Sequence, residues 1–121
     1  MSELAQYLQS LPEPQRATVE RVYARARALV PDARDGLGYG LPALLLAGKP
    51  LLCVMVARHH IGLYPFSPAA LDTVRDELAD FSLSKGTVRF SADHLLPDDV
   101  VDRLVLARRS EIEDRRGFEN A

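Results

Sequence analysis

The centre of the chain decides the fold, because its apolar residues run consecutively instead of recurring at helical spacing. The stretch reads Ala43-Leu44-Leu45-Leu46-Ala47-Gly48-Lys49-Pro50-Leu51-Leu52-Cys53-Val54-Met55-Val56-Ala57. Two short apolar runs, 43–46 and 51–57, separated by a turn sequence are typical of a β-hairpin. The segment His60–Tyr64 predicts a further strand. We therefore predict three consecutive strands at the centre of the fold.

The strand predicted over 51–57 is apolar on both of its faces. Side chains alternate along a strand, so Leu51, Cys53 and Met55 point one way and Leu52, Val54 and Val56 point the other way. A small antiparallel sheet usually leaves one face in water. We therefore expect both faces to be covered, either by helices on each side or by a second subunit. The second case would make the protein a homodimeric interaction module.

Segments of helical periodicity and one further strand surround this hairpin. A helix is predicted over 12–30, and Ser10 and Glu13 before and within its first turn have the form of a capping box. The order α-β-β-β-α-β-α predicts an α+β fold in which helices pack on an antiparallel sheet of four to five strands. The other predicted elements are a short helix over 3–9, a helix opened by Ser67 and buried along Leu71, Val74, Leu78 and Phe81, a strand over 86–90, and a last helix from Pro97.

The composition describes one domain of ordinary size. The chain has 121 residues, 47% of them hydrophobic, and its single cysteine excludes a disulfide framework. Its 15 basic and 17 acidic residues nearly balance, which argues against a nucleic-acid or anionic-membrane partner. No targeting segment is visible, so we expect a cytoplasmic protein. We place one domain at 1–116 and a flexible tail at 117–121.

One set of residues would meet if the third strand and the strand over 86–90 belong to one sheet. Each member lies on or next to a strand and carries an aromatic, imidazole or cationic group. Such a patch would suit a small anionic or aromatic ligand. The alternative is that the glycines nearby only shape turns and the basic groups are solvated or pair with acids. The five candidate residues are Tyr39, His60, Tyr64, Lys85 and Arg89.

Acidic residues repeat at four-residue spacing in the helix opened by Ser67. On a helix, Asp72, Asp76 and Asp80 would share one face. Carboxylates are hard oxygen ligands that iron or another hard cation accepts. The alternative is a solvated outer face with Arg75 beside it. We expect a weak metal site there and no tightly bound cofactor.

The sequence offers no spacing that assembles a nucleophile, a base and an orienting group. Cys53 lies in the most apolar strand, where burial disfavours the reactive thiolate. His59 and His60 are adjacent, so on a strand they would point to opposite faces and could not share a metal. Neither the Walker nor the dinucleotide-binding glycine pattern occurs. We therefore predict a binding or interaction protein rather than an enzyme.

Several short phrases together resemble the YdhG-like family of unknown function, whose members include proteins described as frataxin-like intracellular iron chaperones. The resemblance covers nearly the whole chain, and it implies helices packed on an antiparallel sheet. It also implies iron binding and delivery of iron to an acceptor protein. The phrases are Tyr7-Leu8 with Leu11-Pro12, Pro31-Asp32-Ala33, Tyr39-Gly40-Leu41-Pro42, Gly48-Lys49-Pro50, His60-Ile61-Gly62-Leu63-Tyr64-Pro65 and Ser84-Lys85-Gly86-Thr87-Val88-Arg89-Phe90.

Overall fold

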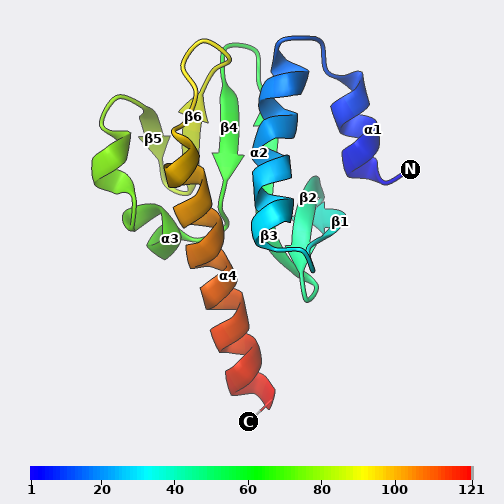
Figure 1. Cartoon of the computed structure of the whole chain (residues 1–121), viewed down its shortest axis with the longest axis vertical. Coiled ribbons are helices and arrows are strands. Elements are labelled where there is room, and N and C mark those ends of the chain that lie inside the picture. The colour runs from blue at the N-terminus through cyan, green and yellow to red at the C-terminus, as the bar shows by residue number, and fades with distance from the viewer. Residues whose placement is uncertain (121) are drawn as a thin grey trace.

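Six strands form one antiparallel sheet, and the two longest helices pack on it (Figure 1). The computed structural model describes the backbone of residues 1–120 and the side chains of residues 1–114. The strands lie in the order β1-β2-β3-β4-β6-β5. The elements are α1 (Glu3–Ser10), α2 (Gln15–Leu29), β1 (Arg34–Gly38), β2 (Leu41–Leu46), β3 (Lys49–Val56), β4 (Ile61–Tyr64), α3 (Pro68–Asp72), the 3-10 helix η1 (Arg75–Leu78), β5 (Ser82–Ser84), β6 (Thr87–Phe90) and α4 (Asp98–Asn120).

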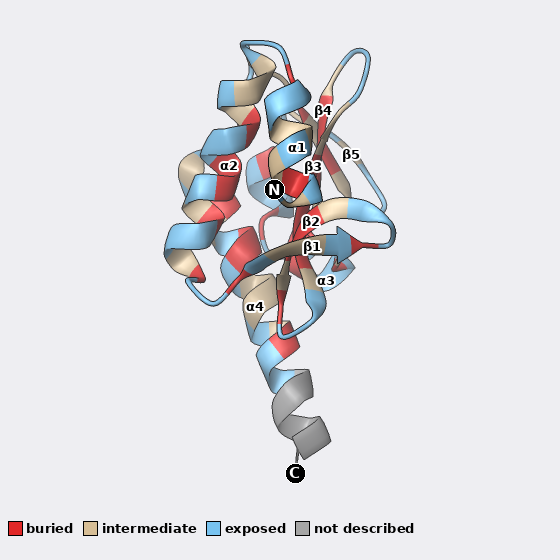
Figure 2. Ribbon diagram, turned by 90° about the vertical axis from the view of Figure 1, so that its right-hand side faces the viewer, coloured by how far each residue is buried: buried red, intermediate tan, exposed pale blue. Residues whose placement is uncertain are grey.

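The core lies between the sheet and the helices α2 and α4. These helices run side by side, and both contact β3 (Figure 1). Val22 of α2 and Leu104 of α4 are buried together with Leu52 and Val54 of β3. Figure 2 shows the buried residues of α2 on the side that faces the sheet. The shorter α1 packs mainly on β1 and β2.

The predicted α+β fold is confirmed, but the sheet has six strands instead of four to five. The two extra strands, β1 and β5, are its edges. Neither carries a β-branched residue, and β1 contains Gly36 and Gly38, so neither has the composition that favours strands. Each is held by a hairpin to the neighbouring strand, β1 to β2 and β5 to β6.

Two helix predictions need correction. The capping box is not formed, because Ser10 is the last residue of α1 and its hydroxyl donates to the Tyr7 carbonyl. Ser67 does cap α3, since its hydroxyl accepts from the Ala70 N–H at 3.0 Å. However, α3 ends after five residues, and the 3-10 helix η1 follows. Arg103 of α4 donates to the Thr73 carbonyl at this break.

Both faces of β3 are buried within the single chain. Leu51 and Cys53 have no exposed surface, and Leu52 and Val54 on the opposite face are at most 1% exposed. Contacts to β3 come from β1 as well as from α2 and α4. The apolar pattern of this strand therefore needs no second subunit to explain it.

Tyrosine hydroxyls complete the hydrogen bonding of β3 beyond the point where its pairing with β2 ends. The register of β2 with β3 extends only from Lys49 to Leu52. Beyond that point, the Val54 N–H donates to the Tyr23 hydroxyl at 2.8 Å and the Val56 N–H to the Tyr7 hydroxyl at 2.7 Å. Two helices thus satisfy backbone donors that would otherwise be buried without a partner.

The flexible tail predicted over 117–121 lies outside the part of the chain whose side chains are described. Its boundary therefore stays a prediction. None of the described helices combines the length and the apolar character that crossing a bilayer requires.

Candidate functional site

The five residues predicted to form one ligand patch are distributed over two ends of the sheet. β4 and β6 are antiparallel, with Ile61 opposite Phe90. His60 therefore lies beyond one end of this strand pair, whereas Lys85, in the β5–β6 turn, lies beyond the other end. The single patch is not formed, because the register separates its imidazole from its lysine.

Tyr64 packs against its own strand, and Arg89 bonds to the neighbouring strand β5. A Cβ atom at Gly62 would lie 3.2 Å from the Tyr64 hydroxyl and 3.3 Å from its ring, so this ring occupies the space beside the glycine. The Arg89 guanidinium donates to the Ser84 hydroxyl at 2.9 Å and to the Ser82 hydroxyl at 3.4 Å. These contacts make both residues part of the sheet surface.

Tyr39 forms the tip of the β1–β2 hairpin. Tyr39 and Gly40 both have positive φ, 52° and 80°, as a tight two-residue hairpin turn requires. The Tyr39 ring is 86% exposed and stacks on Phe66, with a centroid distance of 5.7 Å. It therefore joins the hairpin tip to the connection between β4 and α3.

The predicted carboxylate face at Asp72, Asp76 and Asp80 is not formed. Its helical spacing is lost because α3 ends at Asp72 and η1 is a 3-10 helix. The Asp72 carboxylate pairs with Arg75 at 2.8 Å. Among the described residues, no group of three or more His, Cys, Asp or Glu side chains is placed to hold a metal ion.

Cys53 is buried in the sheet and contacts polar atoms of its neighbours. Its thiol donates to the Pro42 carbonyl at 3.3 Å. Burial raises the pKa of the Cys53 thiol to about 11, so the thiolate is scarce at neutral pH. Burial also raises the pKa of the Tyr23 hydroxyl. Both groups remain neutral, which suits their structural contacts.

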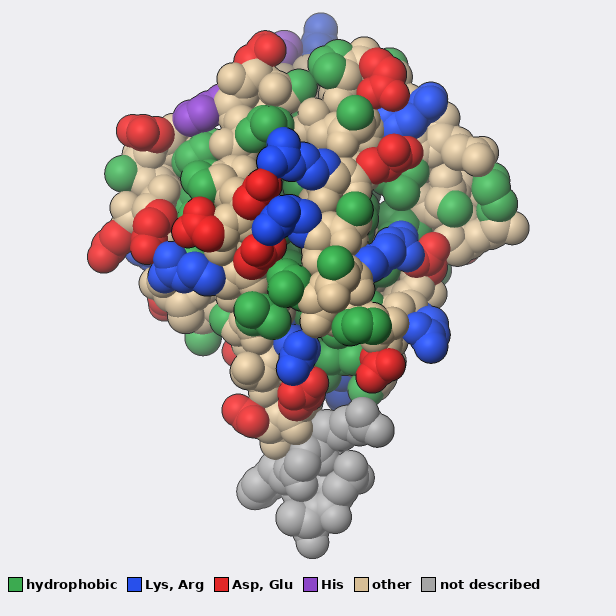
Figure 3. All heavy atoms as spheres, viewed as in Figure 1, with side chains coloured by type: hydrophobic (Ala, Val, Ile, Leu, Met, Phe, Trp, Pro, Cys, Tyr) green, Lys and Arg blue, Asp and Glu red, His purple; other side chains and the backbone are tan. Residues whose placement is uncertain are grey.

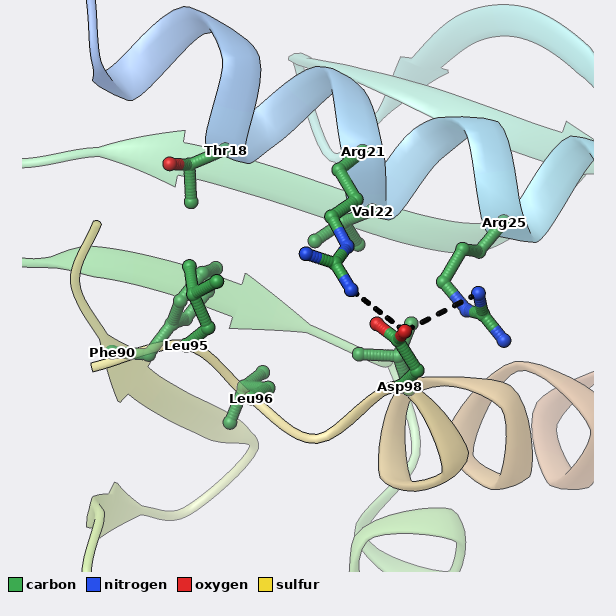
Figure 4. Close-up of a pocket in the computed structure, with 9 residues that line it drawn as sticks. Thr18, Arg21, Val22, Arg25, Phe90, Leu95, Leu96 and Asp98 are labelled. Atoms are coloured by element: carbon green, nitrogen blue, oxygen red, sulfur yellow. Dashed lines mark hydrogen bonds and ion pairs between the residues drawn. The ribbon is translucent and has the colours of Figure 1, made fainter. Parts of the chain in front are cut away.

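A cleft between α2 and α4 is closed by ion pairs (Figure 4). Arg21 contacts Asp98 at 2.7 Å, and Arg25 contacts Asp98 at 3.5 Å and Asp102 at 2.7 Å. The Arg21 guanidinium holds the pKa of the Asp98 carboxyl below its usual range. The free volume of the cleft is only about 10 Å³, enough for one water molecule. This cleft is therefore a packed helix interface.

A basic cavity lies at the end of the sheet that carries His60. We call it the His60 cavity; its volume is about 160 Å³. The β3–β4 turn forms one wall, closed by the Ala57 N–H donating to the His60 carbonyl at 2.8 Å. Figure 3 shows histidine and basic side chains at the top of the molecule, where this turn lies in Figure 1. The lining residues are Gln15, Val56, Ala57, Arg58, His59, His60, Ile61, Ser91 and Ala92.

The sequence prediction included His60 but omitted two basic neighbours. Arg58 and His59 line the same cavity. The prediction that His59 and His60 point to opposite faces of a strand is wrong, because the strand begins only at Ile61 and both residues belong to the turn. The consecutive basic residues before the strand were the signal that could have indicated this site.

Comparison with known proteins supports the observed fold. No family model matches the sequence, and no curated protein matches it. Among solved structures, the chain is similar to a protein of the DUF1801 family, YdhG, from Bacillus subtilis, with a TM-score of 0.79 over 92% of this chain and 91% of that chain. The sequence identity is 14%. The chain therefore has a YdhG-like fold.

Proposed function

We propose that the chain is a non-catalytic binding protein that holds a small anion in the His60 cavity. The observation that carries this proposal is the lining of the cavity. Arg58, His59 and His60 contribute basic groups, Gln15 and Ser91 contribute neutral hydrogen-bond donors, and none of the lining residues is acidic. A concave site lined by basic and neutral hydrogen-bonding residues and by no carboxylate favours an anionic ligand.

The surroundings of the cavity support the same conclusion. The Glu13 carboxylate, two residues before the lining residue Gln15, accepts a hydrogen bond from the Ala17 N–H at 2.9 Å, at the start of α2. Arg58 and His59 are exposed, so a ligand can reach them from solvent. The volume of about 160 Å³ is well below that of a pocket for a drug-sized molecule. A phosphate-sized anion is the class that this space fits.

Iron delivery, which the family resemblance implies, is not the function we propose. The acidic residues predicted to bind iron, Asp72, Asp76 and Asp80, are separated by the break between α3 and η1. Asp72 is paired with Arg75. An anaerobic calorimetric titration with Fe(II) would distinguish the two functions. Heat that disappears when Asp72, Asp76 and Asp80 are all replaced by Asn would favour iron over the anion.

Nuclear magnetic resonance with inorganic phosphate as the probe tests the anion proposal. We expect saturable shifts of the backbone amides at 57–61 and 91–92, and their loss in the double variant Arg58→Gln, His60→Gln. Arg89→Gln is the matched control, because Arg89 is basic but lies outside the cavity lining. Shifts that never saturate, or an equal loss in the control, would contradict the proposal.

A further inference from the structure

We propose that the free edge of β1 is an interface at which a second copy of this chain adds its own β1 in antiparallel orientation. β1 is one of the two edges of the sheet. In Figure 2 it lies at the front, with no helix or strand before it. An exposed edge strand offers unpaired backbone donors and acceptors to another strand.

The register of the β1–β2 hairpin indicates which backbone groups are free. Gly38 and Leu41 flank the two-residue turn and are paired, so they form a hydrogen-bonded pair, and the pairs alternate from there. Asp35 and Leu37 therefore direct their N–H and C=O groups away from β2. Within the described residues, no helix, loop or side chain forms a hydrogen bond with these main-chain groups.

These two residues make β1 complementary to itself. When a two-fold axis passes beside Gly36, Asp35 of each copy faces Leu37 of the other copy. Each such pair exchanges two backbone hydrogen bonds, so the interface has four in total. In this register, Gly36 of each copy faces Gly36 of the other and forms no hydrogen bond across the axis. A central position without such a bond suits a glycine.

β1 begins with the charged residues Arg34 and Asp35, but towards its tip the hairpin exposes apolar side chains. Leu37 is 46% exposed, Tyr39 86% and Leu41 37%. Natural edge strands are usually protected by charge, by proline or by short length. The opposite edge, β5, is only three residues long, whereas β1 has five residues and exposes a leucine near its centre. This contrast favours β1 as the edge that associates.

A charge placed at Leu37 tests the register as well as the interface. Asp35 and Leu37 share a face, because they are two residues apart on the strand. The Asp35 carboxylate already contacts Arg27 at 2.9 Å and Ser2 at 2.5 Å. In the proposed pair, Leu37→Asp places two carboxylates opposite each other, whereas Leu37→Lys places an ammonium group opposite Asp35.

The decisive experiment is sedimentation velocity of the full chain over a wide concentration range. We expect a reversible dimer whose dissociation constant rises by about tenfold or more in Leu37→Pro, which removes two of the four backbone bonds. Proline is tolerated at this position because the lost N–H belongs to the edge. Leu37→Asp should weaken the dimer more than Leu37→Lys, and Leu106→Asp should leave it intact, since Leu106 is comparably exposed but lies on α4.

Circular dichroism of each variant establishes that it is folded, and Leu37→Asp carries the test if the proline variant is not. A chain that stays monomeric at every concentration would overturn the proposal. So would a dimer that is indifferent to all three Leu37 substitutions, because it would use another surface. If the chain stays monomeric and a different protein adds a strand at β1, the edge is the correct binding surface. The proposal that a second copy of this chain occupies it would then be overturned.

Discussion

The two halves of the sheet are stabilised in different ways. β3, β4 and β6 lie in a half covered by α2 and α4, where Leu63, Val88 and Leu104 are fully buried. The β1–β2 hairpin packs mainly beside α1, and Gly38 is the buried residue of β1, whereas Ala43, Leu44 and Leu46 of β2 are buried. Polar contacts, such as that of Ser2 with Asp35, link α1 to β1. One continuous sheet therefore combines a half covered by the two longest helices with an edge hairpin whose inner strand is buried and whose outer strand is mostly exposed.

The largest expected effect is in the helix-covered half. Leu104→Ala should lower the free energy of unfolding by about 2–5 kcal/mol, because it leaves a cavity where the side chain is fully buried. Urea denaturation measures this change. Leu106→Ala is the matched control two residues along the same helix, where the side chain is 38% exposed. Equal losses in the two variants would show that α4 is not packed as described.

The boundary between the halves should respond next most strongly. Tyr23→Phe removes the partner of the buried Val54 N–H, which we expect to cost about 1–3 kcal/mol of unfolding free energy. Tyr7→Phe should cost less, because the Tyr7 bond to the Val56 N–H is only partly buried. Hydrogen exchange at the two amides measures each effect locally. Unchanged exchange at Val54 in Tyr23→Phe would mean that another group had replaced the hydroxyl.

A smaller effect, again in the helix-covered half, depends on pH. Arg103 hydrogen bonds with Glu77 at 2.7 Å and lowers the pKa of the Glu77 carboxyl. The unfolded chain then binds the proton more readily, so this contribution is present above the ordinary carboxyl range and is lost as pH falls through the lowered value. Thermal unfolding at decreasing pH should show a shallower acid loss in Arg103→Gln than in the parent chain. Arg89→Gln, which leaves Glu77 paired, should keep the parent slope.

The same contrast between halves explains how far the sequence could predict the structure. β3 and α2 of the covered half agree with the strand predicted over 51–57 and the helix predicted over 12–30, because consecutive apolar residues and helical periodicity are local patterns. β1 was missed because Gly36 and Gly38 do not favour strands, and only pairing with β2 makes them one. The roles of Tyr7 and Tyr23 were also missed, since a tyrosine in an apolar stripe does not reveal which distant amide its hydroxyl meets.

The candidate site was harder to predict than the fold for a related reason. The spacing of Asp72, Asp76 and Asp80 assumes a continuous helix, but Arg103 from a distant part of the chain bonds to the carbonyl at the break. His60 was placed on a strand, whereas it belongs to a turn. In the first case the helix ends at Asp72 instead of continuing to Phe81, and in the second the strand begins one residue later than predicted. Both errors changed which side chains share a surface.

The smallest expected effect lies at the hairpin tip, where two contributions oppose each other. Tyr39→Asn removes the stack on Phe66, worth about 0.5–1.5 kcal/mol in buried pairs and less at this exposed site. Asparagine, however, adopts the positive φ of 52° at this position more readily than tyrosine does. Tyr39→Ala loses the stack without that gain, so it should be the less stable variant. If the two variants are equally stable, the backbone preference of asparagine contributes nothing measurable at this turn, and the predicted difference between them is contradicted.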